Sequence, residues 1–307
     1  MKSVTFSYCY QTLLADIKKI KNDYPFLEVG SIGKSVMGRD LFYIRLGKGD
    51  NIVMYNAAHH ALEWLTSRVL MQFCFDYAEG YLNNSCLLDT NILDFFYEHS
   101  IYIVPMVNPD GVDLVLNGLD KNMPEHAALA KICGKNINYA TVWQANIRGV
   151  DLNHNYDAGW AYGKSLEKQC GVNGPGPTRY SGAYAESEPE SKALADFARS
   201  KDFLTTLCYH SQGEVIYYTY PLVQIPTSKL FAERLARLSG YECDNTEGMA
   251  SFSGYKDWFM HYFNRPGFTI EVGRGVNPLP HTDFPAIYEK NLPILLNTPI
   301  IAKKLLR

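Results

Sequence analysis

The sequence predicts a single α/β domain with a central mixed, largely parallel twisted sheet and helices on both faces. Short runs rich in β-branched and aromatic residues alternate with long stretches whose apolar residues recur at helical spacing. The chain has 307 residues, of which 47% are hydrophobic and 20% are charged, as in an ordinary globular protein with one large core. We therefore expect one domain over residues 1–307, without repeats or linkers.

The first helix is expected at residues 10–22, where leucine and isoleucine recur at helical spacing before Pro25. Strands follow at 41–44, 52–55 and 101–105, and a helix at 62–82 separates the last two. Further along the chain we expect helices at 187–200, 228–239, 255–263 and 285–305, and strands at 205–209, 215–218 and 268–272.

Residues 106–186 differ from the rest of the chain. Glycine, proline, asparagine and tyrosine are frequent there and periodicity is poor, so we expect a long irregular segment. Such a segment inside a compact domain usually serves function. Ligands of parallel sheets bind outside the carboxyl ends of the strands, which is where polar residues should be sought.

Charge and cysteine content exclude several classes of protein. A net charge of −3 is not the excess of positive charge that nucleic-acid-binding domains carry. No segment approaches the roughly 18 apolar residues of a membrane span, and residues 1–6 lack the apolar run of a signal peptide. The seven cysteines are irregularly spaced, which suggests neither a disulfide framework nor a thiolate zinc site. We expect a cytoplasmic protein without nucleic-acid or membrane partners; the oligomeric state stays open.

A metal site is indicated where the strand at 52–55 runs into the helix at 62–82. His60 and Glu63 are three residues apart, so at a helix start they share one face. Imidazole and carboxylate together suit Zn²⁺. His59 offers a competing pairing with Glu63, and a plain surface helix start, with Glu63 favouring the helix dipole, is the structural alternative.

Two later strands end in residues that complete such a site. His210 follows the strand at 205–209 and is a candidate third ligand, the alternative being a hydrogen-bonded core histidine. Three protein ligands with an open fourth position are typical of catalytic zinc. Glu271 lies among apolar neighbours and suits a general base with a raised pKa, unless it pairs with Arg274 or Arg148.

The order of these motifs resembles the zinc carboxypeptidases, or funnelins. The family pattern is H-x-x-E, then G-V-D-L-N-x-N at 149–155, then a strand ending in His-Ser and a strand ending in Glu. The resemblance covers about residues 30–280, and residues 31–39, 107–112, 180–190 and 256–258 support it. It implies that fold and one Zn²⁺ ion held by His60, Glu63 and His210, with Glu271 as general base.

Within that family the sequence looks most like the bacterial γ-D-glutamyl-L-diamino-acid peptidases. Residues 143–149, 210–214 and 271–280 carry this likeness. It implies hydrolysis of the bond between γ-linked D-glutamate and meso-diaminopimelate or lysine, so the expected partner is a muropeptide fragment.

The resemblance also implies roles for residues outside the metal site. Asp151 matches the carboxylate that orients the first histidine ligand. Arg148 matches the arginine that stabilises the oxyanion. Arg274 and Asn277 are candidate contacts to the diamino acid or its neighbouring carboxylate.

Three positions depart from the family pattern. Asn153 is kept, but His154 replaces the arginine that clamps a terminal carboxylate, which weakens a general exopeptidase reading. Met249 stands where the family has its active-site tyrosine, with Tyr255 as a nearby substitute, and Leu62 precedes the ligand glutamate where many members have arginine.

A general metallocarboxypeptidase, a deacylase on this fold and a catalytically idle binder of wall fragments remain alternatives. Endo- versus exopeptidase action and diaminopimelate versus lysine specificity stay open.

Overall fold

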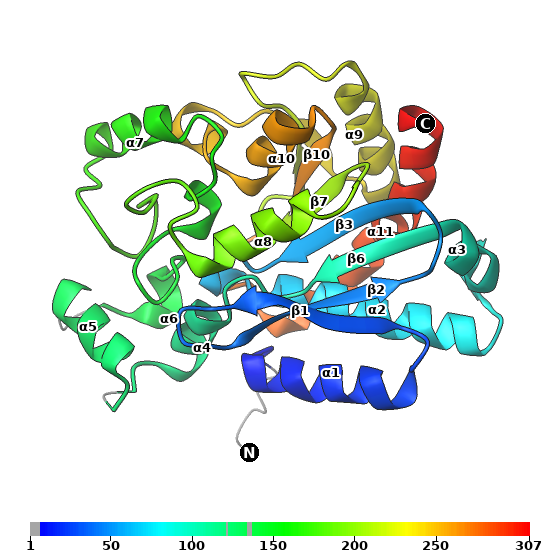
Figure 1. Ribbon diagram of the computed structural model, residues 1–307, viewed down its shortest axis with the longest axis horizontal. Helices are drawn as coiled ribbons and strands as arrows, with labels where there is room; N and C mark the ends of the chain where they lie inside the picture. The colour runs from blue at the N-terminus through cyan, green and yellow to red at the C-terminus, as the bar shows by residue number, and fades with distance from the viewer. Residues whose placement is uncertain (1–6, 121, 134–136) are drawn as a thin grey trace.

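The structure is a computed structural model that describes residues 7–120, 122–133 and 137–307, and its centre is an eight-stranded sheet (Figure 1). The strands of this sheet are β1 (Glu28–Lys34), β2 (Asp40–Leu46), β3 (Asn51–Ala57), β6 (His99–Val104), β7 (Thr206–His210), β8 (Val215–Tyr217), β9 (Glu242–Asp244) and β10 (Gly267–Glu271). A separate short hairpin pairs β4 (Cys86–Leu87) with β5 (Thr90–Asn91).

The strand order is β1-β2-β6-β3-β7-β10-β8-β9. The four central strands β6, β3, β7 and β10 are parallel to one another. Antiparallel pairings join β1 to β2, β2 to β6 and β8 to β10, and β9 runs parallel to β8. The predicted mixed, largely parallel sheet is confirmed.

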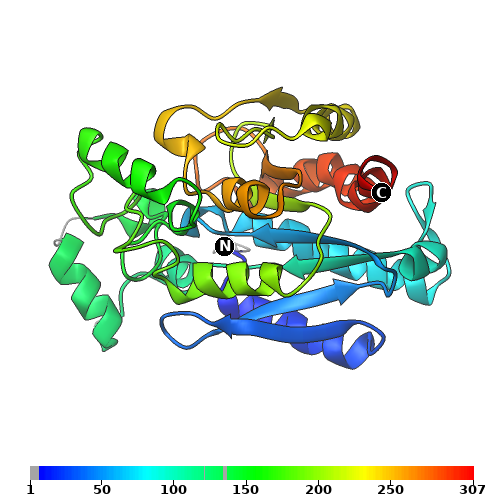
Figure 2. The same cartoon turned by 45° about the horizontal axis from the view of Figure 1, so that its top comes forward.

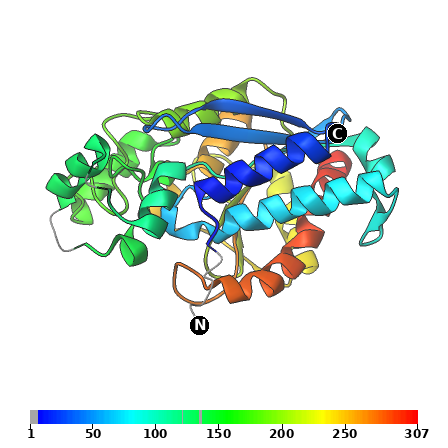
Figure 3. The same cartoon turned by 90° about the horizontal axis from the view of Figure 1, so that it is seen from below.

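Helices cover both faces of the sheet. They are α1 (Tyr10–Asp23), α2 (Leu65–Leu82), α3 (Ile92–Glu98), α4 (Pro109–Asn117), α5 (Pro124–Cys133), α6 (Tyr139–Val142), α7 (Trp160–Gln169), α8 (Pro189–Arg199), α9 (Pro226–Ser239), α10 (Tyr255–Phe263) and α11 (Phe284–Leu306). Short 3-10 turns lie at Ala61–Glu63, Leu152–His154, Gly248–Ser251 and His281–Asp283. α2 and α11 pack on β3, whereas α8 packs on β1 and α10 on β7 and β10. Figure 2 shows α8 in front of the strands, and Figure 3 shows α1 and α2 side by side beneath them.

Alternate residues of β3 enter two different cores, one on each face of the sheet. Val53 and Tyr55 belong to the core that includes α2 and α11, and Met54 belongs to the core that includes α8 and α10. Successive side chains of a strand point to opposite faces, so a strand covered on both sides must be apolar throughout. The continuous apolar run of this strand has that cause.

The expectation of an irregular segment over residues 106–186 was wrong for α4, α5, α6 and α7. α4 shows what was overlooked. Asn108 caps its first turn by accepting a hydrogen bond from the backbone N–H of Gly111 at 3.0 Å, and Pro109 occupies the first helical position. β1, β9 and α3 were also missed; β1 is half-exposed and contains two glycines, so it carries no apolar run.

The carboxyl ends of the parallel strands point toward the segment that contains α4 to α7, at the left of Figure 1. The polar residues singled out in the sequence follow β3, β7 and β10 at this end. Among the described residues, no helix is both long and apolar enough to cross a membrane.

Candidate metal centre and active site

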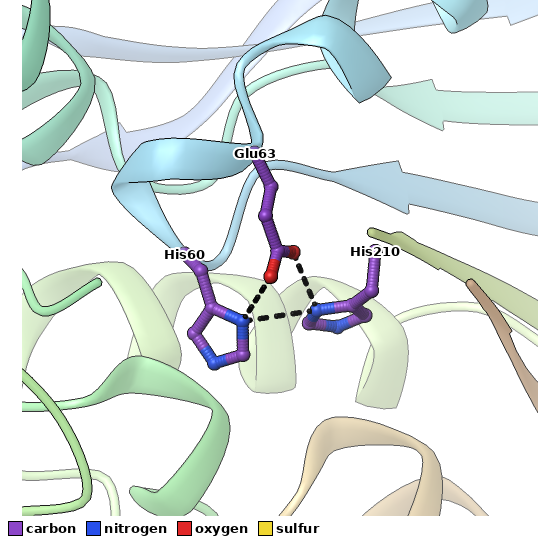
Figure 4. Close-up of side chains that lie close together, drawn as sticks. All are labelled: His60, Glu63 and His210. Carbon is purple, nitrogen blue, oxygen red and sulfur yellow. Dashed lines mark hydrogen bonds and ion pairs between the residues drawn. The ribbon is translucent and has the colours of Figure 1, made fainter. Parts of the chain in front are cut away.

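Two adjacent parallel strands bring His60, Glu63 and His210 together (Figure 4). His60 precedes the 3-10 turn that follows β3, Glu63 ends that turn, and His210 is the last residue of β7. Each nitrogen Nδ1 of the two histidines lies 2.9 Å from a different carboxylate oxygen of Glu63. The two Nδ1 atoms are 3.3 Å apart, so three donor atoms converge on one point.

Asp151 fixes the ring of His60 from the opposite side. Its Oδ1 lies 3.2 Å from Nε2 of His60, and its Oδ2 accepts a hydrogen bond from the backbone N–H of Arg179 at 2.8 Å. Burial alone would raise the pKa of Asp151, but His60 and the hydrogen bonds outweigh it and hold the pKa well below its ordinary value. An ionised Asp151 only accepts, so Nε2 of His60 carries the hydrogen and the lone pair of Nδ1 faces Glu63 and His210.

The chemistry of this cluster fits a zinc ion. Two imidazole nitrogens that face each other at 3.3 Å repel unless a proton or a cation lies between them. Glu63 and Asp151 add two buried carboxylates, which a cation would neutralise. Imidazole nitrogen and carboxylate oxygen are zinc ligands, and a set of three leaves a coordination position open.

His59 takes a different place. Its side chain is buried, its Nε2 is 2.9 Å from the hydroxyl of Tyr156, and its ring stacks on His210 with centroids 5.6 Å apart. The histidine next to Glu63 is therefore His60, and the competing pairing with His59 is not the one that the structure forms.

Glu271 ends β10 directly beside His210, its register partner on β7. Burial, followed by the negative charge of Glu63, holds the pKa of Glu271 well above its ordinary value. The ion pairs considered as an alternative are made elsewhere, because Arg274 lies 3.0 Å from Glu214 and Arg148 lies 3.5 Å from Glu188. Glu271 thus faces the metal cluster with a carboxyl group suited to hold and release a proton.

A cleft of about 430 Å³ opens over Glu271 and His60, within the usual range for a ligand site. Asn153 and His154 line it, as the family pattern implied. Its other walls come from residues that sequence reasoning did not assign to the site: Tyr217, Asn245, Thr246, Glu247, Ala250, Gly254, Lys256, Asp257 and Thr269. Thr269 had a positional signal, since it stands two residues before Glu271 and shares its face of the strand, and Lys256 and Asp257 lie in the segment 256–258 that supports the family resemblance.

Two expected placements need correction. The half-exposed guanidinium of Arg148 pairs with Glu188 and lines a separate cavity with Glu186 and Lys192, so it does not lie beside the metal cluster. Tyr255 is completely buried, with its hydroxyl 3.9 Å from the sulfur of Met54. Its ring belongs to the core under α10 rather than to a surface that a substrate reaches.

Arg274 and Asn277 lie just beyond β10. The side chain of Arg274 is 70% exposed, and Asn277 accepts a hydrogen bond from the hydroxyl of Ser211 at 2.8 Å. Asn277 is thereby tied to the residue that follows His210, whereas the exposed side chain of Arg274 pairs with Glu214. Their contacts to a substrate stay a prediction.

Comparison with known proteins adds to this geometry. The sequence profile described as zinc carboxypeptidase matches residues 13–293. The γ-D-glutamyl-L-diamino acid endopeptidase 1 of Lysinibacillus sphaericus is 39% identical over 292 residues, which are 94% of this chain and 72% of the relative. The uncharacterised protein YqgT of Bacillus subtilis is 34% identical over 283 residues, 91% of this chain and 74% of its own length. The solved structure of bovine thrombin-activatable fibrinolysis inhibitor, bound to a tick carboxypeptidase inhibitor, superposes with a TM-score of 0.74 at 19% identity, covering 97% of this chain and 98% of that one.

Proposed function

This chain belongs to the zinc carboxypeptidase family and is a zinc peptidase, and on that premise we propose that it hydrolyses the γ-D-glutamyl bond to a diamino acid in cell-wall peptides. The observation that carries the proposal is the endopeptidase relative, which is 39% identical over 94% of this chain. The segments at 143–149, 210–214 and 271–280, in which the sequence resembles such peptidases, support it. Its substrate is then a muropeptide fragment.

We assign the zinc ion of the family to His60, Glu63 and His210, whose donor atoms converge at the ends of β3 and β7. When bound there, zinc supplies a Lewis acid that polarises a carbonyl and lowers the pKa of water. Asp151 keeps the hydrogen of His60 on Nε2. Because these residues and Glu271 come from segments far apart in the sequence, residues 1–307 are proposed to act as one catalytic domain.

Glu271 is the general base of the proposed reaction. Its carboxylate takes a proton from the attacking water and holds it until the amide breaks. It then gives the proton to the leaving nitrogen of the diamino acid. No oxyanion role is assigned to Arg148, because its guanidinium is paired with Glu188.

The cleft wall favours this substrate over an ordinary peptide C-terminus. Asn153 and His154 line the cleft, but an imidazole lacks the planar fork with which a guanidinium holds a carboxylate at two points. A general carboxypeptidase depends on such a grip. The departure at His154 therefore supports a substrate recognised by other groups.

The test is to incubate zinc-loaded protein with L-alanyl-γ-D-glutamyl-meso-diaminopimelate and with ordinary C-terminal peptides, and to identify the products by mass spectrometry. We expect cleavage after the γ-glutamyl group. Glu271→Gln should keep zinc and lose turnover by about a hundredfold to ten-thousandfold. Trimming of ordinary peptides alone would replace the proposal with a general carboxypeptidase, and full activity of Glu271→Gln would remove the assigned base.

A further inference from the structure

The floor of the active-site cleft carries a buried pair of opposite charges. The ammonium of Lys256 contacts the carboxylate of Asp257, and it also donates to the carbonyl oxygen of Thr219. Both side chains are buried, at 4% and 2% exposure, and both line the cleft that Glu271 and His60 line. A buried ion pair is rarely more stable than well-packed apolar residues, so its presence here calls for a reason other than stability.

The pair lies at the end of the cleft away from the metal cluster. Gly267, Thr269 and Glu271 occupy one face of β10, since side chains alternate along a strand. A Cβ atom added to Gly267 would meet Cγ of Lys256 at 3.4 Å, so the stem of Lys256 covers the start of that strand. Gly267 and Glu271 are roughly 13 Å apart by strand rise. A substrate side chain entering beside Glu271 therefore runs past Thr269 toward the pair.

Both charges keep hydrogen-bonding capacity. An ammonium has three donors, and the contacts to Thr219 and Asp257 use two of them. The carboxylate of Asp257 bonds to Lys256 through Oδ1 and also accepts a hydrogen bond from the backbone of Gly254, and because each carboxylate oxygen has two lone pairs it keeps further acceptor sites. Asn153 adds a donor, because its Oδ1 accepts from the backbone N–H of Tyr255 at 3.0 Å and its amide hydrogens are not used in that bond.

We propose that the Lys256–Asp257 pair binds the zwitterionic end of the diamino acid side chain and so selects diaminopimelate over lysine. This rests on the proposed function. The far end of meso-diaminopimelate carries a carboxylate and an ammonium on one carbon, which match the third donor of Lys256 and the remaining lone pairs of the Asp257 carboxylate. A lysine side chain brings only an ammonium, which meets the like charge of Lys256 and leaves its donor unpaired.

A purely structural role for the pair predicts a different outcome. Asp257 lies in the first turn of α10, where a carboxylate favours the helix dipole, and Lys256 would merely neutralise it. In that case a change at Lys256 affects stability and all substrates alike. Substrate selectivity is therefore the readout that separates the two roles.

The experiment compares three substrates that share the L-alanyl-γ-D-glutamyl part and end in meso-diaminopimelate, in 2-aminopimelate or in lysine. Wild-type protein should show a kcat/KM about tenfold to hundredfold higher for diaminopimelate than for lysine, with aminopimelate between them. Lys256→Met should lower kcat/KM for diaminopimelate by a similar factor, mainly through KM, and leave the lysine substrate nearly unchanged or improved. Lys19→Met, which removes an exposed lysine paired with Asp23 at 2.5 Å, is the matched control and should change nothing.

Equal cleavage of the diaminopimelate and lysine substrates by wild-type protein overturns the inference, and so does an equal loss on both in Lys256→Met. Cleavage of none of the three substrates contradicts the proposed function instead.

Melting temperature and zinc content establish that each variant is folded. If the Lys256→Met protein is not folded, Lys256→Gln replaces it. The amide of the introduced glutamine still donates to Thr219 and Asp257 but carries no charge. As a second measurement, calorimetry with Glu271→Gln protein should show tighter binding of free meso-diaminopimelate than of L-lysine.

Discussion

Two regions of the molecule contain buried carboxyl groups, and the pKa values of these groups are shifted in opposite directions from the ordinary value. In the metal cluster, burial would raise the pKa of Glu63, but His60 and His210 outweigh it and lower that pKa. At the start of α8, burial dominates and raises the pKa of Glu190 to about 8, although the backbone N–H of Val36 donates to it at 2.9 Å. Burial acts alike in both places, so the nature of the partners decides which carboxyl group stays ionised.

The partners differ in the charge they can offer. The metal cluster provides imidazoles and a place for a dication, whereas Glu190 meets a backbone N–H and the amide of Asn146 at 3.4 Å. Asp110, close by, accepts from Ser35 and Met37 at 2.9 Å each and lies 3.5 Å from the guanidinium of Arg39, and burial still raises its pKa. The neutral donors at Glu190 likewise do not offset its burial. The first region is suited to zinc and the second to a protonated carboxyl group.

The largest effect is expected from removing a zinc ligand, because the metal cluster would then no longer differ from the region of Glu190 by holding a cation. His210→Ala leaves Glu63 with one imidazole, and we expect loss of bound zinc and a fall in turnover of at least about a thousandfold. Zinc content by mass spectrometry and steady-state kinetics measure the two effects. A variant that keeps one zinc ion per chain and normal turnover would remove His210 from the site.

A smaller effect is expected from Asp151→Asn. An amide in this place holds the ring of His60 less firmly, and zinc affinity should fall by about tenfold to hundredfold, as measured by competition with a chelator. Asp113→Asn is the control, because Asp113 pairs with Arg39 at 2.7 Å, outside the site. Equal zinc affinity in both variants would show that the contact between Asp151 and His60 does not support the metal.

The smallest effect on turnover is expected in the second region, where stability alone should change. The folded pKa of Glu190, about 8, exceeds that of an unfolded glutamate, so only the unfolded chain ionises at intermediate pH. Stability should therefore fall as pH rises from about 4.5 to 8, by at most about 1.4 kcal/mol per pH unit from this group. Glu190→Gln should flatten that slope in denaturant titrations, whereas the exposed Glu289→Gln should not. Identical slopes in all three proteins would contradict the raised pKa.

The sheet and the polar residues at its strand ends were within reach of sequence reasoning because local patterns carry them, whereas the choice of His60 over His59 and of His210 as a ligand rested on the family resemblance. An apolar run followed by His60 and Glu63, and another followed by His210, place polar residues at strand ends, and parallel strands end at one edge. The wall of the cleft was not within reach. That Lys256 and Asp257 face it depends on the way α10 packs against β10, which no spacing in the sequence reveals.

Arg148 and Tyr255 show the opposite failure. The family pattern implied a site role for Arg148, and Tyr255 was the nearby substitute for the tyrosine that Met249 replaces, but a side chain turns toward the partner it finds in space. Arg148 finds Glu188, forty positions later, and Tyr255 packs into the core beside Met54. Position along the chain predicts where a backbone passes and leaves open where its side chain points.

The last helix also bears on how the protein matures during synthesis. Asn51 donates to the carbonyl of Pro299 at 2.7 Å and Tyr55 to that of Leu295 at 2.8 Å, so α11 supplies buried hydrogen-bond acceptors to two side chains of β3. Until residues 284–306 have been made, these two side chains lack their acceptors, and this face of β3 packs against α2 without α11. We therefore expect the strand that leads into His60 to reach its final packing only when the last helix has been synthesised.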